Sequence, residues 1–443
     1  MNVLEKALKM LERHPLCNHC LGRQFAFLGQ GMENEERGRI LKNVLVMEAQ
    51  ALARFKKEEG VRILKILATN GFSKLAEETL RKIRSSVPKK AFPKTCFLCE
   101  NCFETVDDLA KNAIEKLSKY EYNTFLVGIE LPVKVEERED EFRARFNVEY
   151  GESIKLEFGR LLSAKIALYS GGKKVEFRKP EIVVLLNPMT EEIRVQVNPL
   201  FIAGRYKKLA RGIPQSKWFC TNCMGRGCEK CNWTGKMYPE SVEEIISQPF
   251  QEATGGVKTS FHASGREDID ARMLGKGRPF VIEISQPRKR FIDLKKLEET
   301  VNTYAKGKVE ISSLRFVDKD FVRKLKKAES ARKEYRVTVE FEKDVSDADL
   351  KLLEEKLSNT VVKQRTPARV LHRRADLTRE KYIYKVKVRR LSPKKAEMRI
   401  RCEGGLYVKE LVAGDDGRTS PSVSEILGQR AKPIKLDVLN VII

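Results

Sequence analysis

Residues 263–280 read ASGREDIDARMLGKGRPF, and the interpretation of the C-terminal half of the chain depends on this stretch. It holds three acidic and four basic residues between glycines, a composition typical of a loop. Asp268 is close in sequence to Arg266, Arg272 and Arg278, and any of these could keep a catalytic carboxylate ionised. The spacing alone favours a salt-bridged loop, with the arginines as structural or RNA contacts, over a catalytic one.

The balance of charge indicates an anionic partner. The 443 residues carry a formal net charge of +24, and charged residues make up 33% of the chain. Such an excess attracts polyanions at long range, so nucleic acid is the predicted partner and an anionic membrane surface is the competing interpretation. Half of the excess lies in residues 361–401, which hold six lysines and nine arginines against three acids.

The sequence predicts neither a membrane segment nor a secretion signal. The apolar runs, such as IVVLL at 183–187, have the length of a strand. The N-terminal MNVLEKALKMLERHP is amphipathic and contains acids, unlike a signal peptide. We therefore expect a cytoplasmic protein that does not bind membranes, and the lack of a coiled-coil heptad leaves a monomer as the expected state.

Four cysteines follow the spacing C-x2-C-x4-C-x2-C at residues 220–231. Two chelating pairs of thiolates match a tetrahedral zinc site, and the glycines between them let the chain turn around an ion. The motif implies no histidine and no open ligand position, so we expect a structural zinc. The predicted ligands are Cys220, Cys223, Cys228 and Cys231.

Two further cysteine pairs lie far apart, in CNHC at 17–20 and CFLC at 96–99, and look like two similar knuckles. In a cytosolic chain, C-x-x-C groups indicate metal binding rather than disulfides, so a second structural zinc is expected. Its predicted ligands are Cys17, Cys20, Cys96 and Cys99. Cys102 could replace Cys96 or Cys99, and His19 is another possible ligand.

The chain divides into four parts. Residues 1–103 show helical periodicity between the knuckles, and residues 104–210 mix helices with strands such as TFLVGIEL and EIVVLLN. Residues 211–239, rich in glycine, proline and cysteine, form a knuckle-bearing linker. Residues 240–443 alternate helices with β-rich stretches such as YRVTVEF. This pattern predicts an α+β protein.

Two basic segments are candidate RNA contacts. Residues 364–381 begin with a Thr-Pro turn and carry five arginines, and residues 285–296 form a second basic loop. Closely spaced arginines neutralise successive phosphates and bind them bidentately, so the first segment predicts a finger along an RNA backbone. A solvated turn is the alternative for each segment. The candidate residues are Arg365, Arg369, Arg373, Arg374, Arg288, Lys289 and Arg290.

GREDIDARMLGKGRPF resembles the active-site segment of the archaeal and eukaryotic tRNA pseudouridine synthases that modify uridines 54 and 55 of the TΨC loop. More distantly, its Gly-Arg-Glu-Asp resembles the G-R-T-D element of bacterial tRNA pseudouridine synthases. The resemblance implies that Asp268 is the essential aspartate. It also implies that Arg266 holds the turn or contacts the flipped strand.

Three downstream segments are similar to other elements of the same family. EGGLYVKELVAG resembles its G-x-Y-[IV]-[RK] element, which implies that Tyr407 and Lys409 bind substrate and that Lys409 pairs with the aspartate. EYRVTV implies an aromatic side chain, Tyr335, that packs on the target base. LDVLNV resembles the closing strand whose first leucine, Leu436, lines the pocket. Ordinary core packing is the alternative for Tyr335 and for Leu436.

The resemblance covers nearly the whole chain. Residues 197–218 are similar to the junction after the family's RNA-binding THUMP domain, and the knuckles are similar to its N-terminal metal module. The implied fold is α+β: a pseudouridine synthase catalytic domain with a mixed or antiparallel sheet, preceded by a zinc and THUMP-containing accessory domain. Leu406 departs from the threonine of related synthases, and CENC at 99–102 lacks the knuckle's glycine, which leaves the second zinc's ligand set open.

The implied reaction converts uridine to pseudouridine in tRNA and needs no organic cofactor. The sequence contains neither G-x-G-x-x-G nor G-x4-G-K-[ST]. Two competing interpretations remain. A non-catalytic zinc-containing tRNA-binding protein or chaperone would use the basic segments but leave Asp268, Lys409 and Tyr335 unexplained as a set. A THUMP-containing methyltransferase would bind S-adenosylmethionine, which we do not expect.

Overall fold

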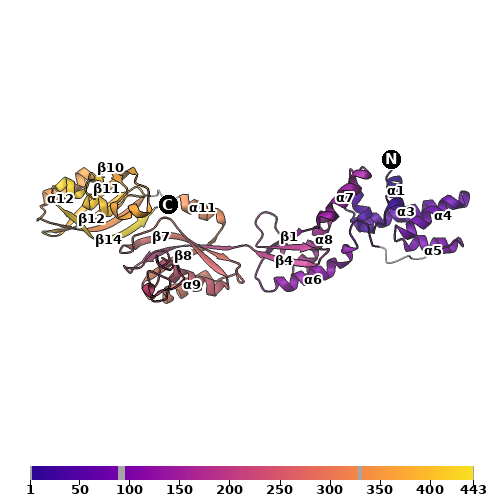
Figure 1. Ribbon diagram of the computed structural model, residues 1–443, viewed down its shortest axis with the longest axis horizontal. Helices are drawn as coiled ribbons and strands as arrows, with labels where there is room; N and C mark the ends of the chain where they lie inside the picture. Colours follow the sequence, from indigo (N-terminus) through magenta and orange to yellow (C-terminus); the bar gives the residue numbers. More distant parts are fainter. Residues whose placement is uncertain (1, 88–94, 328–331, 443) are drawn as a thin grey trace. The chain divides into compact units, whose positions relative to one another are not determined.

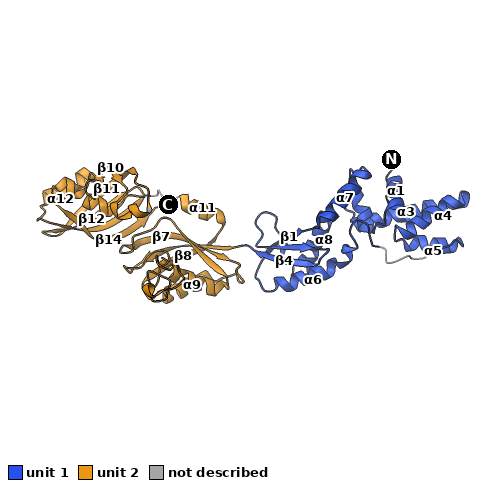
Figure 2. Cartoon of the chain, in the orientation of Figure 1, with its two compact units in different colours: residues 1–198 blue, residues 199–443 orange. Residues whose placement is uncertain are grey.

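The computed structural model of the chain describes residues 2–87, 95–327 and 332–442 (Figure 1). The chain divides into two compact units, residues 1–198 and 199–443 (Figure 2). Buried apolar side chains form one core in the first unit and two main cores in the second, so each unit is described by itself.

The first unit begins with packed helices. Asn2 and Glu5 form a capping box at the start of the first helix, which satisfies backbone donors that have no helical partner. The helices are α1 (Val3–Arg13), α2 (Asn18–Gly22), α3 (Asn34–Phe55), α4 (Lys57–Thr69), α5 (Lys74–Lys82), α6 (Val106–Leu117), α7 (Val133–Arg145) and α8 (Ile154–Tyr169), with 3-10 turns at Arg23–Phe25 and Cys102–Thr105.

Helices α2 and α3 cross at two glycines. A Cβ atom on Gly22 would lie 1.8 Å from the Asn34 carbonyl oxygen, and one on Gly38 would lie 2.0 Å from the Asn18 carbonyl oxygen. Only glycine allows backbones to approach this closely. The crossing fixes the short helix that carries Cys20 against the longest helix of the unit.

A four-stranded sheet completes the first unit, in the order β2-β1-β3-β4. Its strands are β1 (Thr124–Ile129), β2 (Lys174–Val175), β3 (Ile182–Asn187) and β4 (Glu192–Val197). β1 runs parallel to both of its neighbours, while β3 and β4 form an antiparallel hairpin. Every second residue of β3 is buried, and the same core contains apolar residues of α6 and α8, so these helices cover one face of the sheet.

The second unit contains a ten-stranded mixed sheet in the order β13-β10-β11-β12-β9-β14-β7-β5-β8, with β6 paired to β7. Its strands are β5 (Leu200–Lys208), β6 (Lys258–Ala263), β7 (Arg272–Ser285), β8 (Val309–Val317), β9 (Lys333–Phe341), β10 (Thr360–Arg365), β11 (Thr378–Ser392), β12 (Lys395–Cys402), β13 (Thr419–Ser420) and β14 (Ala431–Val441). All pairs are antiparallel except β14 with β7. The predicted α+β class with a mixed or antiparallel sheet is confirmed.

Helices cover the large sheet over two cores. They are α9 (Val242–Thr254), α10 (Leu294–Tyr304), α11 (Lys319–Lys327), α12 (Asp347–Leu357), α13 (Val408–Ala413) and α14 (Val423–Leu427), with 3-10 turns at Glu229–Cys231 and Ala368–Arg373. α9 and α10 pack with β5, β7 and β8 in one core, and α12, α13 and α14 pack with β9, β11 and β12 in the other. Tyr335 of β9 touches both cores.

The boundary between the units differs from the one predicted at residue 210. Residues 192–204, EIRVQVNPLFIAG, hold the end of one strand system and the start of the next: β4 ends before Asn198-Pro199, and β5 pairs with β7 and β8 of the second unit. Proline has no backbone N–H and cannot continue the ladder of β4. Residues 211–239, predicted as a separate linker, also lie within the second unit.

Within the described ranges, no helix combines the length and the apolar character that crossing a membrane requires.

Replacing Ile282 with alanine should destabilise the second unit. Ile282 is fully buried in β7, between Ile202 of β5 and Phe261 of β6. A buried isoleucine truncated to alanine costs about 2–5 kcal/mol of unfolding free energy. Urea unfolding followed by the fluorescence of Trp218 and Trp233, both in this unit, measures the loss. Val257→Ala, at a residue 68% exposed, is the control and should change stability by less than about 0.5 kcal/mol. Equal effects would contradict the assigned core.

Candidate active site

The loop that carries Asp268 joins β6 to β7, and several side chains donate hydrogen bonds to its backbone carbonyls. Arg278 Nη1 donates to the Ser264 carbonyl (2.6 Å), and Gln215 Nε2 donates to the Gly265 carbonyl (3.0 Å). Lys208 Nζ donates to the carbonyls of Asp268 (3.0 Å) and Ile269 (3.1 Å). The path of the loop is therefore fixed at both ends.

A buried ion pair lies under the same loop. The side chains of Glu267 and Arg278 are 0% and 1% exposed, and Arg278 Nε donates to Glu267 Oε2 at 2.9 Å. The Tyr206 hydroxyl also donates to Glu267, at 2.9 Å. Burial, and next the Glu267 carboxylate, raise the pKa of Tyr206 well above its usual value. Because Glu267 is anchored in the interior, the neighbouring Asp268 is fixed at the surface of the adjoining cavity.

Two cations approach Asp268, and each has a second carboxylate partner. Lys409 Nζ lies 3.4 Å from Asp268 Oδ2 but only 2.7 Å from Asp270 Oδ1. Arg369 Nη2 lies 3.2 Å from Asp268 Oδ2, and its Nε lies 2.7 Å from Glu410 Oε1. The implied pairing of Lys409 with Asp268 is thus the longer of its two contacts. Arg369, predicted as a phosphate contact, is the nearer of the two cations to Asp268.

Partial burial works against the ionisation of Asp270, yet the hydrogen bond and charge of Lys409 lower its pKa below the usual value. Asp270 is thus the carboxylate that Lys409 neutralises most directly. The five groups form a chain of alternating charge that runs Asp270, Lys409, Asp268, Arg369, Glu410.

A cavity of about 930 Å³ opens beside Asp268. The residues that the sequence resemblance assigned to substrate line it together: Arg266, Tyr335, Tyr407, Lys409 and Leu436. Tyr335 is half-buried and Leu436 is 8% exposed, so both are core residues as well as parts of the cavity wall. Burial raises the pKa of the Tyr335 hydroxyl, so this side chain meets the cavity as a neutral aromatic ring.

The predicted RNA-binding residues fall into different places. Arg369 and Arg374 line the cavity, whereas Arg365 pairs with Asp376 at 2.7 Å. Arg288 and Lys289 are exposed after β7. Arg290, predicted with them, is only 6% exposed, so its side chain is turned inward, unlike those of Arg288 and Lys289. The side chain of Arg373 lies outside the described part of the structure.

Sequence reasoning missed several charged residues of this region. Lys208 is fully buried, although its sequence, YKKLARG, resembles any surface run of lysines. Lys333 and Lys381 line the cavity from separate strands. Asp437 receives hydrogen bonds from Arg211, Arg272 and Arg336, which come from three segments far apart in sequence. No local pattern indicates such contacts.

The three guanidinium groups around Asp437 act against its burial and hold the pKa of this carboxyl at about 2. Asp437 and Arg272 also face each other where β14 pairs with β7, one residue beyond the loop that carries Asp268. This cluster therefore fixes the C-terminal end of the loop to the closing strand.

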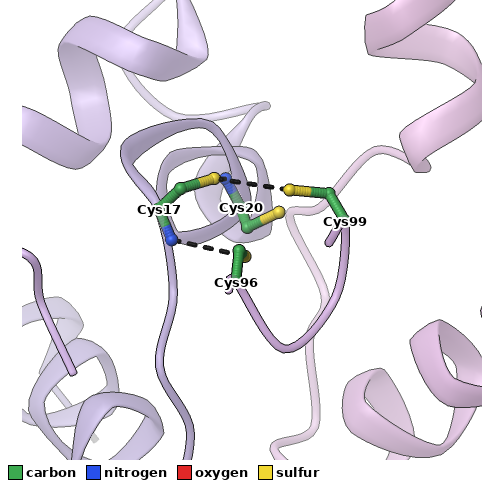
Figure 3. Close-up of side chains that lie close together, drawn as sticks. All are labelled: Cys17, Cys20, Cys96 and Cys99. Atoms are coloured by element: carbon green, nitrogen blue, oxygen red, sulfur yellow. Dashed lines mark hydrogen bonds between the residues drawn. The ribbon is translucent and has the colours of Figure 1, made fainter. Parts of the chain in front are cut away.

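The structure brings the separate cysteine pairs together. Cys17, Cys20, Cys96 and Cys99 form one group, with the Cys17 and Cys99 sulfurs 3.7 Å apart (Figure 3). Cys102 is outside this group, although it is also buried.

The second group consists of Cys220, Cys223, Cys228 and Cys231. In each group the four sulfurs lie within 4.8 Å of one another, a spacing that a single metal ion could bridge.

Each group also has donors that suit thiolates. Arg23 Nη1 donates to Cys20 Sγ at 2.8 Å from a fully buried position. In the second group the backbone N–H groups of Gly227 and Gly235 donate to Cys223 and Cys231 at 3.2 Å. Positive charge and N–H donors stabilise sulfur in its anionic, metal-binding form. The residues present therefore fit a tetrahedral metal ion.

Comparison with known proteins gives two family matches. A family model described as "Pus10, C-terminal" matches residues 201–442, and one described as "Pus10 THUMP domain, archaeal" matches residues 109–187. The tRNA pseudouridine synthase Pus10 of Methanocaldococcus jannaschii is 46% identical over 442 residues, which cover 98% of this chain and 93% of that protein. The Pus10 of Methanothrix thermoacetophila is 41% identical, with 99% and 94% covered. That of Pyrococcus furiosus is 39% identical, with 99% and 98% covered.

The Asp437 carboxylate should stabilise the fold in a pH-dependent way. Its pKa of about 2 lies below the value of about 3.9 in an unfolded chain, so the stabilisation is present above about pH 4 and is lost as the pH falls through 2. The shift corresponds to about 2–3 kcal/mol. Urea unfolding of wild type and Asp437→Asn should show a difference at pH 6 that shrinks toward pH 2. Parallel pH profiles for the two proteins would contradict this role.

Proposed function

The chain belongs to the Pus10 family of tRNA pseudouridine synthases, which are isomerases, and we propose that it converts uridines 54 and 55 of the TΨC loop of tRNA to pseudouridine. One observation carries this proposal. The Asp268 carboxylate lies at the wall of a large cavity, between two cations and together with an aromatic side chain, Tyr335.

The target base must leave the loop of the tRNA to reach Asp268. Flipping a base costs a few kcal/mol, least where the base is weakly stacked. Tyr335 offers a ring face to the flipped uracil, and such stacking contributes about 1–3 kcal/mol per base. Leu436 and Val438 supply further apolar wall, so the cavity suits a planar, uncharged base.

The reaction is an isomerisation in which atoms balance without a cofactor. The bond from N1 of uracil to C1′ of ribose breaks, the ring turns, and a bond from C5 to C1′ forms while C5 loses its proton and N1 gains one. Asp268 acts on this nucleotide by attack on the ring or the sugar, or by removal of a ribose proton. Each route requires the carboxylate to be held at the reacting nucleotide. Lys409 and Arg369, whose nitrogens lie 3.4 and 3.2 Å from Asp268 Oδ2, orient it there.

The remaining surface features support a polyanionic substrate. Three further cations, Arg374, Arg379 and Lys381, line the cavity outside the chain of alternating charge around Asp268. Arg288 and Lys289 are exposed in the segment that follows β7. These residues bind phosphates of the tRNA backbone, because arginine and lysine fix the register of a nucleic acid through its phosphates. The THUMP-matched residues 109–187 add a second RNA-binding region.

Both cysteine groups hold structural zinc. Four thiolates in a tetrahedral arrangement select zinc, and no position is left open for substrate. The ion would supply folding free energy, and the chain's own residues, the Cys20 partner Arg23 and the glycine N–H groups, donate to the sulfurs that would bind it.

Asp268→Asn should abolish pseudouridine formation while tRNA binding is retained. The amide keeps the shape of the carboxylate but removes its charge and basicity, so we expect a loss of at least about 10²–10⁴-fold in rate. Pseudouridine at each position of an unmodified tRNA transcript, together with a filter-binding assay, measures both properties.

Asp270→Asn is the matched control, because it removes the closer partner of Lys409 and leaves Asp268 intact. It should reduce the rate far less. Equal conversion by wild type and Asp268→Asn would move the chemistry to another residue. Tight binding with no conversion by either protein would favour a non-catalytic tRNA-binding protein.

Metal analysis of the purified chain should find two zinc ions per molecule. Cys96→Ser should lose one of them, because three ligands bind zinc far more weakly than four. Cys102→Ala, at a buried cysteine outside the group, should keep both. Loss of zinc from Cys102→Ala but not from Cys96→Ser would exchange the two residues in the ligand set.

A further inference from the structure

A second cavity, of about 180 Å³, is also lined by Asp268, and Trp218 forms part of its wall. We propose that it binds the nucleotide adjacent to the target uridine in the same RNA strand, with the base of that nucleotide stacked on Trp218. This inference rests on the proposed function, since it names a further substrate contact of the same site.

The two cavities meet at the catalytic carboxylate. Arg266, Asp268, Arg369 and Lys409 line both of them. Beyond this shared wall the larger cavity contains Tyr335 and Leu436, whereas the smaller one contains Pro214, Ser216 and Trp218. Two ligands, one in each cavity, would therefore be separated by the shared residues around Asp268.

The covalent structure of the substrate places a neighbouring nucleotide close to the smaller cavity. The ribose of the target uridine must lie at Asp268 while its base occupies the larger cavity, and a phosphodiester joins that ribose directly to the next nucleotide. The space that adjoins Asp268 is then where an attached neighbour can be received. Arg266 and Lys409 supply positive charge for the linking phosphate. Of the other two acids of the smaller cavity, Asp270 is paired with Lys409 and Glu267 with the buried Arg278.

Trp218 is held in place by the cysteine knuckle that follows it. Its carbonyl accepts a hydrogen bond from Met237 N (3.0 Å), and its ring meets that of Tyr238 edge to face, with centroids 5.8 Å apart. Two residues later Cys220, a member of the second cysteine group, donates from its backbone to Gly235 (2.8 Å). The indole is half-buried, so a rigid support holds an aromatic face at the cavity.

The other end of the same segment is fixed to the loop of Asp268. Gln215 Nε2 donates both to the Tyr206 hydroxyl (2.7 Å) and to the Gly265 carbonyl (3.0 Å). Residues 215–220 thus connect the active-site loop to the cysteine knuckle. The knuckle has a positional role for substrate in addition to stabilising the fold.

Fluorescence provides a direct test, because the chain has only two tryptophans. Trp233→Phe leaves Trp218 as the sole tryptophan of the full-length protein. An unmodified TΨC stem-loop RNA should quench its emission, because stacking on a base quenches indole. Two variants of this RNA carry an abasic residue in place of the 5′ or the 3′ neighbour of the target. Both should bind, and one of them should quench much less. Equal quenching by the two abasic RNAs, or binding without quenching, would overturn the proposal.

Kinetics gives a second, independent readout. Trp218→Ala should raise the KM for the stem-loop about tenfold or more, the loss expected from one stacked base, while Trp218→Phe should restore most of it. With the abasic RNA, wild type and Trp218→Ala should differ little. Trp233→Ala, at a 73% exposed tryptophan of the same knuckle, is the matched control and should leave KM unchanged.

The controls separate the possible failures. Zinc content shows whether a variant keeps its knuckle, and if Trp218→Ala loses the metal, Trp218→Phe and the fluorescence titration decide. An unchanged KM in Trp218→Ala with an intact knuckle would overturn the subsite while the synthase activity stands. Absence of pseudouridine formation by wild type would instead contradict the proposed function, and the quenching test would still report on RNA binding at Trp218.

Discussion

The rest of the site depends on the hydrogen bonds that the buried Lys208 donates to the loop of Asp268. Its buried ammonium group donates to three carbonyl oxygens, of Ile213, Asp268 and Ile269, at 2.8–3.1 Å. Burial lowers the pKa of Lys208, so the fold must compensate the ammonium with well-placed acceptors. Two of these three acceptors belong to the loop of Asp268, so a movement of the loop would leave the buried ammonium group with fewer hydrogen bonds.

The ion pair of Glu267 and Arg278 gives the loop its direction. Removing one partner of a buried pair costs about 3–5 kcal/mol, because the other charge is left without compensation. Glu267 must therefore point inward, and the adjacent Asp268 is directed to the cavity. Two neighbouring acids in the sequence thus have different roles, one structural and one at the surface of the site.

The cations around Asp268 are balanced locally, although the chain as a whole carries +24. Lys409 is shared between Asp268 and Asp270, and Arg369 between Asp268 and Glu410. Shared cations hold Asp268 in place without giving it a single strong partner, which leaves the carboxylate accessible at 35% side-chain exposure. The excess positive charge lies elsewhere, where it is available to phosphates.

Part of this organisation is readable from the sequence alone. Helices and strands follow from apolar periodicity, and the C-x2-C-x4-C-x2-C spacing brings four thiolates together within twelve residues, because chelation of this kind is local. The stretch around Asp268 is recognisable because the residues that carry its resemblance are contiguous in the sequence. The α+β class follows from the same periodicity, whereas the mixed or antiparallel sheet is implied by the family resemblance; Pro199 separates β4 of one sheet from β5 of the other.

Other features were decided by the tertiary structure. Sequence spacing does not indicate that Lys409 would bond Asp270 across 139 positions more closely than Asp268, nor that Arg369 would reach Asp268. Nor does it distinguish the buried Lys208 and Arg290 from the exposed Arg288. The physical reason is range: periodicity and chelate spacing act between near neighbours in the chain. Which charge is buried, and which carboxylate a cation reaches, depends on surfaces that only folding brings together.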